Sequence, residues 1–267
     1  MGVARSEAAE PAVLLSERAP LAYRSLLIAI ASAGERFVAV GERGHVLLSD
    51  DKGRTWVQAD LVPTQALLTG VCFMDARRGI AVGHDEVILA TQDAGRTWQR
   101  THYAPQAQQP LLDVACNPGG HAIAVGAYSA YLVSEDGGAS WTERKFEPRP
   151  LPTARTAVAP PSAAKSGAAR APETIGGGYH LNRIVAASAS RLYIAAEAGH
   201  LYRSEDGGGS WVELPSPYQG SFFGVLPLTR DALLAYGLRG TPLRCWMAPR
   251  PSATVQWPSS ACPASCW

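Results

Sequence analysis

The hydrophobic positions of this chain fall into short runs that are bounded by Gly, Asp or Pro. Leu26–Ala31, Phe37–Gly41 and Val46–Leu48 form the first group of such runs, and the same order of runs returns along the chain. The runs are rich in Val, Ile, Leu and Tyr, which suit strands. No segment keeps a helical period with caps. The pattern predicts an all-β chain built from repeated groups of strands.

An eight-residue polar phrase follows the third run in four of these groups. It reads Ser/Thr, any residue, Asp, any residue, Gly, any residue, Ser/Thr, Trp, and it spans Ser49–Trp56, Thr91–Trp98, Ser134–Trp141 and Ser204–Trp211. Asp holds a turn by accepting backbone N–H groups, Gly supplies a positive φ, and Trp supplies a large apolar body. We therefore interpret these positions as structural: Asp51, Gly53, Trp56, Asp93, Gly95, Trp98, Asp136, Gly138, Trp141, Asp206, Gly208 and Trp211.

The spacing of the phrase indicates the fold. Trp56 and Trp98 are 42 residues apart, and Trp98 and Trp141 are 43 apart. Four-stranded units that repeat at this distance are typical of β-propeller blades, which must cover one another's faces. The phrase that is due after Arg244 is missing. The sequence thus predicts a β-propeller of four complete antiparallel blades and a partial fifth, arranged as an arc or incomplete ring.

The same pattern divides the chain. Residues 1–22 form an N-terminal segment, residues 23–244 hold the repeats, and residues 147–178 are an insertion rich in Pro, Ala and Gly that we expect to be a surface loop. Residues 245–267 change abruptly to Cys, Trp, Pro and Ser. We expect this tail not to form a blade and to reflect a frameshift or truncation.

Composition narrows the function. The chain has 267 residues, of which 46% are hydrophobic and 18% charged, with a formal net charge of +1. That balance argues against a nucleic-acid partner. The apolar run at Leu26–Ala33 is too short to span a bilayer, so no direct membrane span is expected. The abundance of Arg over Lys suggests a bacterial source.

The positions of the cysteines in the sequence do not indicate a metal site. Cys72 and Cys116 lie inside strand runs, where we expect them to be buried as small apolar groups. Cys262 and Cys266 have no His companions in the tail, which argues against zinc. No metal and no cofactor are predicted.

The repeated phrase resembles the Asp-box, or bacterial neuraminidase repeat. The order of Ile80–Gly83, Val87–Leu89 and the box at Thr91–Trp98 is similar to the photosystem II stability and assembly factor family, over roughly residues 23–244. That resemblance implies a seven-bladed, non-enzymatic propeller. It also implies a protein partner, a subunit of a membrane complex such as photosystem II in photosynthetic members, and a location in the periplasm or cell envelope.

A sialidase-like glycoside hydrolase is the alternative. Such an enzyme needs an Arg cluster, a Tyr–Glu pair and a facing acid. The Arg-Ile-Pro phrase that opens sialidase propellers is absent, and Arg149–Pro152 is a loose echo of it. The acidic residues outside the boxes include Glu42, Asp85, Glu86 and Glu197, and the sequence does not pair any two of them. No catalytic residue is assigned.

Propeller geometry indicates where a partner would bind. The loops that join the second and third strands open on the face opposite the boxes. Arg, Tyr and His in these loops suit peptide binding, although each is also an ordinary solvated turn residue. Arg43 and Arg239 occupy the same repeat position, and the family resemblance implies an arginine-lined face. The candidate binding residues are Arg43, His45, His84, Asp85, Tyr128, Glu197, His200 and Arg239.

Overall fold

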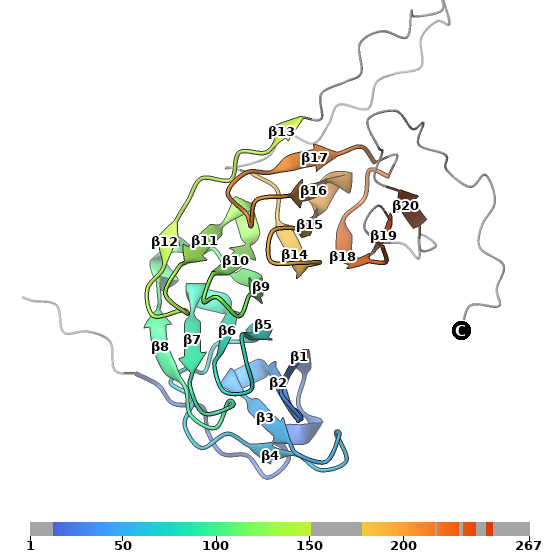
Figure 1. Cartoon of the computed structure of the whole chain (residues 1–267). Coiled ribbons are helices and arrows are strands. Elements are labelled where there is room, and N and C mark those ends of the chain that lie inside the picture. The colour runs from blue at the N-terminus through green and yellow to red at the C-terminus, as the bar shows by residue number, and fades with distance from the viewer. Residues whose placement is uncertain (1–12, 151–177, 217, 230–231, 239–243, 248–267) are drawn as a thin grey trace, which may run out of the picture.

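The blades follow one another along an arc (Figure 1). The computed structural model describes residues 13–150, 178–216, 218–229, 232–238 and 244–247. Four sheets contain four consecutive antiparallel strands each, and a further sheet contains three. The first strand of each blade lies on the inner side of the arc and contacts the first strand of the next blade. The propeller architecture predicted from the repeats, with an incomplete ring, is confirmed.

The strand boundaries are these. Blade 1 holds β1 (Leu27–Ala33), β2 (Arg36–Gly41), β3 (Val46–Ser49) and β4 (Val57–Gln58). Blade 2 holds β5 (Leu68–Phe73), β6 (Gly79–Gly83), β7 (Ile88–Thr91) and β8 (Gln99–His102). Blade 3 holds β9 (Leu111–Cys116), β10 (Ala122–Gly126), β11 (Tyr131–Ser134) and β12 (Thr142–Glu143). Blade 4 holds β14 (Leu181–Ala186), β15 (Leu192–Ala196), β16 (Leu201–Ser204) and β17 (Val212–Leu214). Blade 5 holds β18 (Phe222–Pro227), β19 (Ala232–Gly237) and β20 (Arg244–Met247).

Blade 5 shows where the repeat pattern stops. Its third strand, β20, pairs with β19 and continues to Met247, three residues into the segment that the composition set apart as the tail. The backbone pairing therefore crosses the sequence boundary at Arg244. The rest of the predicted tail, residues 248–267, lies outside the described residues.

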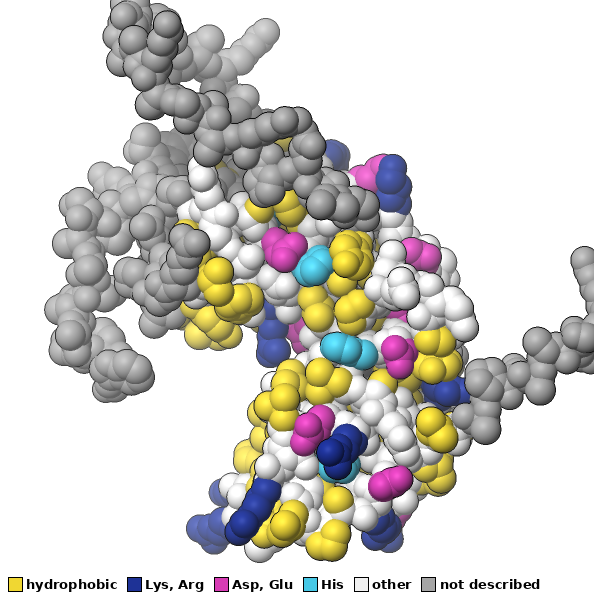
Figure 2. All heavy atoms as spheres, turned by 180° about the vertical axis from the view of Figure 1, so that it is seen from behind, with side chains coloured by type: hydrophobic (Ala, Val, Ile, Leu, Met, Phe, Trp, Pro, Cys, Tyr) yellow, Lys and Arg dark blue, Asp and Glu magenta, His cyan; other side chains and the backbone are white. Residues whose placement is uncertain are grey.

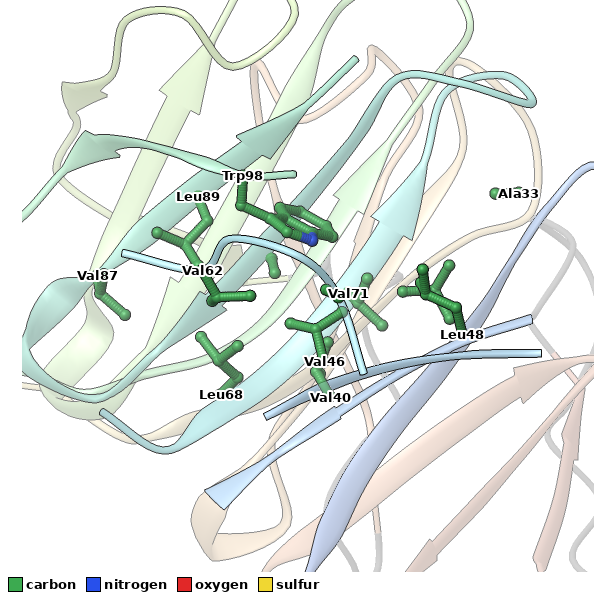
Figure 3. Close-up of a cluster of buried hydrophobic side chains, with 13 residues drawn as sticks. Ala33, Val40, Val46, Leu48, Val62, Leu68, Val71, Val87, Leu89 and Trp98 are labelled. Atoms are coloured by element: carbon green, nitrogen blue, oxygen red, sulfur yellow. The ribbon is translucent and has the colours of Figure 1, made fainter. Parts of the chain in front are cut away.

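Apolar side chains fill the spaces between neighbouring blades. Between blades 1 and 2, Val40 and Val46 meet Val71 and Leu89 in one buried cluster that also holds Trp98 (Figure 3). Both faces of an inner blade are buried in this way, which explains why its strands read as nearly continuous apolar runs. Burial of such clusters is the main stabilising contribution to a stack of blades.

Polar bonds between first strands fix how adjacent blades sit. Thr69 lies at a β-bulge in β5 and donates from its hydroxyl to the carbonyl of Leu111 in the next blade, at 2.7 Å. Asn182 lies at the same bulge position in β14 and donates to the carbonyl of Phe222, at 2.7 Å. The bulge thus turns a side chain toward the next blade, where it makes a bond that apolar packing alone would not specify.

The Asp-box turns form as their sequence predicts. In blade 1, Asp51 accepts hydrogen bonds from the Ser49 hydroxyl and from both the amide and the hydroxyl of Thr55, at 2.6–2.8 Å. The same three bonds recur at Asp93, Asp136 and Asp206. The hydrogen bond from the Thr55 side chain, followed by the one from its amide, lowers the pKa of Asp51 to about 2. The carboxylate of each box Asp therefore finds its hydrogen-bond donors within its own turn.

The box glycine also serves the contact between blades. Gly138 has a φ of +87°, a left-handed conformation that favours glycine. A Cβ atom there would lie 2.9 Å from Cδ1 of Ile80 in the preceding blade. Gly138 is therefore required both by the turn and by the close approach of blade 2.

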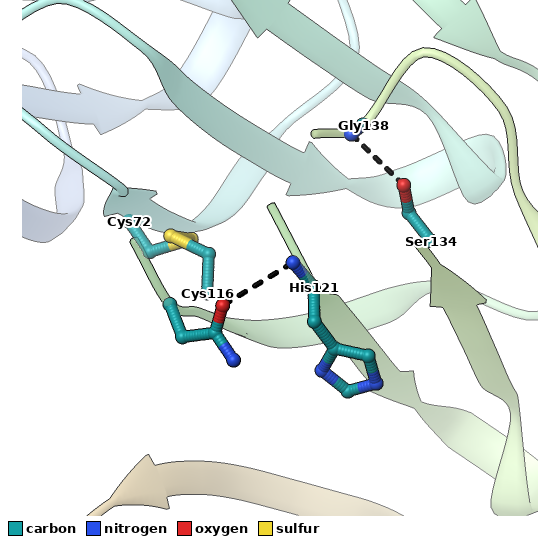
Figure 4. The surroundings of a disulfide bond; sticks show 6 residues. Cys72, Cys116, His121, Ser134 and Gly138 are labelled. Atoms are coloured by element: carbon teal, nitrogen blue, oxygen red, sulfur yellow. Dashed lines mark hydrogen bonds between the residues drawn. A yellow bond between two sulfur atoms is a disulfide. The ribbon is translucent and has the colours of Figure 1, made fainter. Parts of the chain in front are cut away.

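The two strand cysteines form a disulfide, and the expectation that they are merely buried apolar groups is wrong. Cys72 in β5 and Cys116 in β9 are bonded across the junction of blades 2 and 3, with a Cα–Cα distance of 6.1 Å (Figure 4). Both residues are half-buried. The sequence places them in different repeats, and only the packing of neighbouring first strands brings them together.

The segments flanking the blades are partly ordered against them. In the N-terminal segment, Ala22 lies in the one-turn helix η1 (Ala22–Arg24) and covers Ala39 and Leu47 on the free face of blade 1. The predicted insertion begins with a short strand, β13 (Arg149–Pro150), which pairs in parallel with β17. Residues 151–177 of the insertion lie outside the described residues. No helix in the described part of the chain is long and apolar enough to cross a membrane.

Candidate functional site

The loops between second and third strands form one continuous face. Four of them are one-turn 3-10 helices: η2 (Glu42–Gly44), η3 (His84–Glu86), η5 (Ala127–Ser129) and η6 (Glu197–Gly199). The first amide of each loop donates to the carbonyl just before the first strand of its own blade, and the loop of blade 5 repeats this bond. This face therefore also carries the linkers that enter each blade. Along the face seen in Figure 2, His side chains are spaced across the blades with acidic side chains near them.

The middle residue of each turn is displayed in the same way. Arg43, Asp85, Tyr128 and Ala198 have φ values between 51° and 61°. The left-handed region is uncommon for residues other than glycine. Its recurrence in four blades shows that the conformation belongs to the turn itself. Arg43, Asp85 and Tyr128 are exposed at their tips, so the face presents a different side chain at each blade.

In blade 1 the two predicted residues have different roles. Arg43 is exposed, and its carbonyl accepts a bond from the Ser16 hydroxyl at 2.9 Å. His45 is only 3% exposed, and its Nδ1 lies 3.0 Å from the Ser25 hydroxyl. Burial lowers the pKa of His45, with the Glu42 carboxylate opposing that effect. Arg43 is available to a partner, whereas His45 supports the loop from below.

Blade 2 combines exposed and buried polar groups. His84 and Asp85 are both exposed on η3. The neighbouring Glu86 is buried and lies 3.1 Å from Nε2 of His102, which belongs to the outer strand β8. The Glu86–His102 pair anchors the turn that displays His84 and Asp85.

The densest polar and aromatic cluster lies where blades 3 and 4 meet. The ring of Tyr128 packs edge-on against His180, with centroids 4.9 Å apart. Glu197 accepts the His180 amide at 3.0 Å and lies 3.4 Å from its Nδ1. Tyr179 packs against His200, with centroids 4.1 Å apart. The structure thus brings Tyr128, Glu197 and His200 into one cluster.

His200 has a second neighbour on its own blade. Its Nδ1 lies 2.6 Å from Oε1 of Glu213 in β17. His200 occupies the repeat position of His45, but it is half-buried rather than buried. Only His200 of this equivalent pair is therefore within reach of a partner.

One of the eight candidates is not described by the structure, and three further residues were not predicted. Arg239 lies outside the described residues, so the arginine-lined face rests on Arg43 alone among the described loop tips. The sequence reasoning missed Tyr179 and His180, which come from the linker into blade 4, and His102. The two linker residues could have been predicted from the strand order. The connection from the fourth strand of one blade to the first strand of the next lies on the same face as the second-to-third loops.

A buried charge lies on the inner wall of the arc. Asp113 in β9 is 4% exposed, accepts the amide of Ile184 at 2.9 Å and lies 3.2 Å from Nε of Arg183 in β14. Burial raises the pKa of Asp113 to about 6, and the Arg183 charge opposes that rise. Gly70 leaves room for it, because a Cβ there would lie 2.9 Å from the Asp113 Cα. This pair joins blades 3 and 4 beside the central opening.

The polar groups of the face are distributed rather than convergent. The four carboxylates Glu42, Asp85, Glu86 and Glu197 belong to three different blades, and no hydrogen bond or ion pair among the described residues joins any two of them. Nor does any group of three or more His, Cys, Asp and Glu in the described part of the chain have the arrangement of a metal site. The arrangement suits recognition of an extended surface.

The fold and these turns define a class: the chain is a β-propeller built from Asp-box blades. Residues 54–158 match the family model described as photosynthesis system II assembly factor YCF48. The match runs from within the first box into the insertion, and it confirms the predicted resemblance to the photosystem II assembly factor-like Asp-box propellers.

Several solved structures are similar to this chain, and those with a TM-score of 0.60 share its fold. A structure described as YCF48 bound to D1 peptide is 16% identical, covers 84% of this chain and 93% of that chain, and has a TM-score of 0.41. The WD40 repeats of RRP9 are 10% identical, with 88% and 66% covered and a TM-score of 0.60. An ancestral GH74 enzyme is 14% identical, with 87% and 30% covered and a TM-score of 0.60. No match was found among curated proteins.

Proposed function

We propose that this chain is a non-enzymatic scaffold that binds a segment of a protein partner on the second-to-third loop face and acts in the assembly or stabilisation of a membrane protein complex. The match of residues 54–158 to the assembly-factor family carries this proposal. The partner is a subunit of that complex, which is photosystem II where the source organism is photosynthetic.

The geometry of the face supports a peptide partner. Arg43, Asp85 and Tyr128 stand exposed on three successive blades, and each supplies a different kind of contact. A guanidinium forks onto carboxylates or carbonyls, a carboxylate meets a cation, and a Tyr ring gives rigid contact area. A polypeptide crossing several blades meets all three, whereas a small substrate needs groups that converge on one reacting atom.

The disulfide supports a location outside the cytoplasm. Disulfides such as Cys72–Cys116 form and persist in oxidising compartments and are rare where thiols are kept reduced. We propose a location in the periplasm or cell envelope. Reaction of the protein from intact cells with a maleimide reagent, before and after reduction, tests this location.

The binding proposal is tested with the D1 peptide of the YCF48 complex, labelled and titrated by fluorescence anisotropy. The expected result is saturable binding that Arg43→Glu weakens at least tenfold, a change of about 1.4 kcal/mol. Arg54→Glu is the matched control, because Arg54 is also exposed on blade 1 but lies in the box turn on the opposite face. Equal weakening by both variants, or no binding, would overturn the proposal.

The comparison with solved structures gives no specific support to the glycoside hydrolase alternative. A likeness to a GH74 enzyme at 14% identity shows the shared fold alone. Incubation with a fluorogenic sialoside and with xyloglucan separates the two functions. We expect no turnover above that of buffer, and turnover that disappears in Glu197→Gln would favour the enzyme.

A further inference from the structure

Blade 2 receives an extra segment on its outer side from the preceding linker. The Asp60 amide donates to the carbonyl of Arg96 at 2.8 Å, and the Trp98 amide donates to the carbonyl of Leu61 at 3.0 Å. Leu61 and Thr97 pair in parallel. Val62 is 2% exposed and packs in the same cluster as Trp98, which is 1% exposed (Figure 3). The box Trp of blade 2 is therefore covered by a passing strand.

Blade 4 is covered in the same way by a different linker. The Arg149 amide donates to the carbonyl of Trp211 at 2.8 Å, and β13 pairs in parallel with β17. The ring of Phe146 lies 5.8 Å from that of Trp211, which is 4% exposed. In both blades an extended segment adds to the outer edge in parallel and places an apolar side chain on the box Trp.

Blade 3 has no such cover among the described residues. The linker from blade 2 turns away, because the Ala104 amide donates to the carbonyl of Asp85 and Tyr103 is exposed over Arg100. No backbone hydrogen bond from that linker reaches Trp141, which is only partly buried. Figure 1 shows β12 at the outer rim with no strand beyond it. Both residues of β12 are exposed.

The groove beside this edge is larger than the equivalent groove between blades 1 and 2, because the residues at two equivalent positions differ. Between blades 1 and 2 the equivalent groove measures about 330 Å³. It is lined by the ion pair of Arg36 with Asp50, within blade 1, and by that of Arg96 in the blade 2 box with Asp60 in the linker. Between blades 2 and 3 the groove measures about 580 Å³. There Gln92 stands at the position of Asp50, and Ala139 at that of Arg96.

The larger groove is lined by two arginines, Arg77 and Arg78, and by two box carboxylates, and Arg78 is already paired with Asp75. The box carboxylates Asp93 and Asp136 are occupied by their own turns. Arg77 has its Nε 3.3 Å from the carbonyl of Gln92, and no carboxylate stands where Asp50 stands in blade 1. The hydroxyl of Thr101 is buried in this groove without a hydrogen-bond partner. A buried polar group without a partner is unfavourable and marks a place for a polar ligand atom.

We propose that the outer edge of blade 3 is a docking site for an extended peptide of a partner protein. The peptide adds as a parallel strand outside β12, seats a large apolar residue on Trp141 and directs an adjacent Asp or Glu toward Arg77. Edge-strand addition draws its affinity from main-chain hydrogen bonds and its specificity from alternate side chains. The site is independent of the loop face and of the function proposed for it.

The chain supplies a probe, because its own residues 57–66 make these contacts on blade 2. A fluorescent peptide of that sequence is titrated against the full chain by anisotropy. We expect saturable binding that is lost when the amide nitrogen at the Asp60 position is methylated and retained when that at the Leu61 position is methylated, because only the former donates in the template.

Protein variants and hydrogen exchange locate the site. Arg77→Glu, at an exposed position, is expected to weaken binding at least fivefold. Ala139→Arg restores the arginine that pairs with Asp60 on blade 2 and is expected to strengthen binding, and Arg54→Glu in the blade 1 box is the control. Bound peptide is expected to slow exchange at residues 141–143 and not at residues 56–58. Absence of saturable binding, indifference to Asp60 methylation, or protection confined to another blade overturns the proposal.

Discussion

At the scale of single residues, the Asp-box separates what holds the fold from what is free to recognise a partner. Both carboxylate oxygens of Asp93 accept hydrogen bonds from Thr91 and Thr97. The indole N–H of Trp98 donates to the carbonyl of Gly95 at 2.8 Å. These groups lie on the face opposite Arg43 and Tyr128. The box residues are therefore expected to govern stability and not binding at the loop face.

Replacing box residues in blade 2 tests that division. Asp93→Ala removes a turn anchor and is expected to lower the free energy of unfolding by roughly 0.5–2 kcal/mol. Trp98→Ala empties a site that is 1% exposed and is expected to cost about 3–5 kcal/mol. Denaturant titration measures both changes. Lost peptide binding in a variant whose stability is unchanged would make the box a functional element instead.

Asp113 predicts a distinct dependence of stability on pH. Its folded-state pKa, about 6, lies above the ordinary value of 3.8, because burial disfavours the charged form. The stability it contributes is therefore complete below pH 3.8 and is lost as the pH rises through 6. Asp113→Asn is expected to remove this slope, which amounts to roughly 3 kcal/mol between pH 4 and 7.

A box carboxylate provides the control for Asp113. The hydrogen bond from the Ser140 side chain, followed by that from its amide, lowers the pKa of Asp136 to about 2. Its contribution to stability is present above pH 3.8 and is lost as the pH falls through 2. Unfolding free energies measured from pH 2 to 8 should show Asp136→Asn altering the acid end and Asp113→Asn the range from 4 to 7. Parallel curves for wild type and Asp113→Asn would refute the assignment.

At the scale of elements, the junction of β5 and β9 is the one place in the described structure where a covalent bond between side chains joins two blades. The Cys72–Cys116 bond closes a separation of 44 residues. A cross-link of this length stabilises mainly by restricting the unfolded chain, typically by 2–4 kcal/mol. The bond therefore resists separation of blade 2 from blade 3.

Paired replacement of the two cysteines measures that contribution. Cys72→Ala with Cys116→Ala is expected to lower the free energy of unfolding by roughly 2–4 kcal/mol relative to the oxidised wild type. In the presence of a thiol reductant, the two proteins should differ by much less. An equal difference with and without reductant would show that the cysteines act through packing alone.

The elements also show which parts of the structure could be predicted from the sequence. The strands of the four complete blades, the box turns and the second-to-third loops follow from local apolar runs and turn residues and were predicted. The disulfide, the parallel strand β13 and the Tyr128–His180 contact were not, because each joins segments whose proximity depends on how blades pack. Among the candidate site residues, Arg43 and Tyr128 are exposed as expected. His45 is buried, since the Ser25 region closes over it.

At the scale of the whole molecule, the arc leaves blade faces without a neighbouring blade at its ends. Ile30 in β1 is 58% exposed, whereas Ile184, at the same register position in β14, is 3% exposed. At the other end Leu226 and Tyr236 of blade 5 are 52% and 45% exposed. Within the described part of the N-terminal segment, residues 13–22, Ala22 covers the Ala39 and Leu47 part of the blade 1 face.

The same substitution at the two isoleucines tests the open arc. Ile184→Ala should lower the free energy of unfolding by about 2–5 kcal/mol, because it leaves a cavity between blades 3 and 4. Ile30→Ala should change it by no more than about 0.5 kcal/mol, because that side chain is already in contact with solvent. Similar large losses at both positions would mean that blade 1 is packed against another blade in solution.

The central claim is that a protein partner binds the loop face while the box face serves the fold. Hydrogen exchange of the full chain, with and without the D1 peptide of the YCF48 complex, tests it most directly. The account predicts slower exchange at residues 42–45, 84–87, 127–130 and 197–200, and unchanged exchange in the boxes at residues 49–56 and 91–98. Slowing confined to the boxes, or no slowing at saturating peptide, would contradict it.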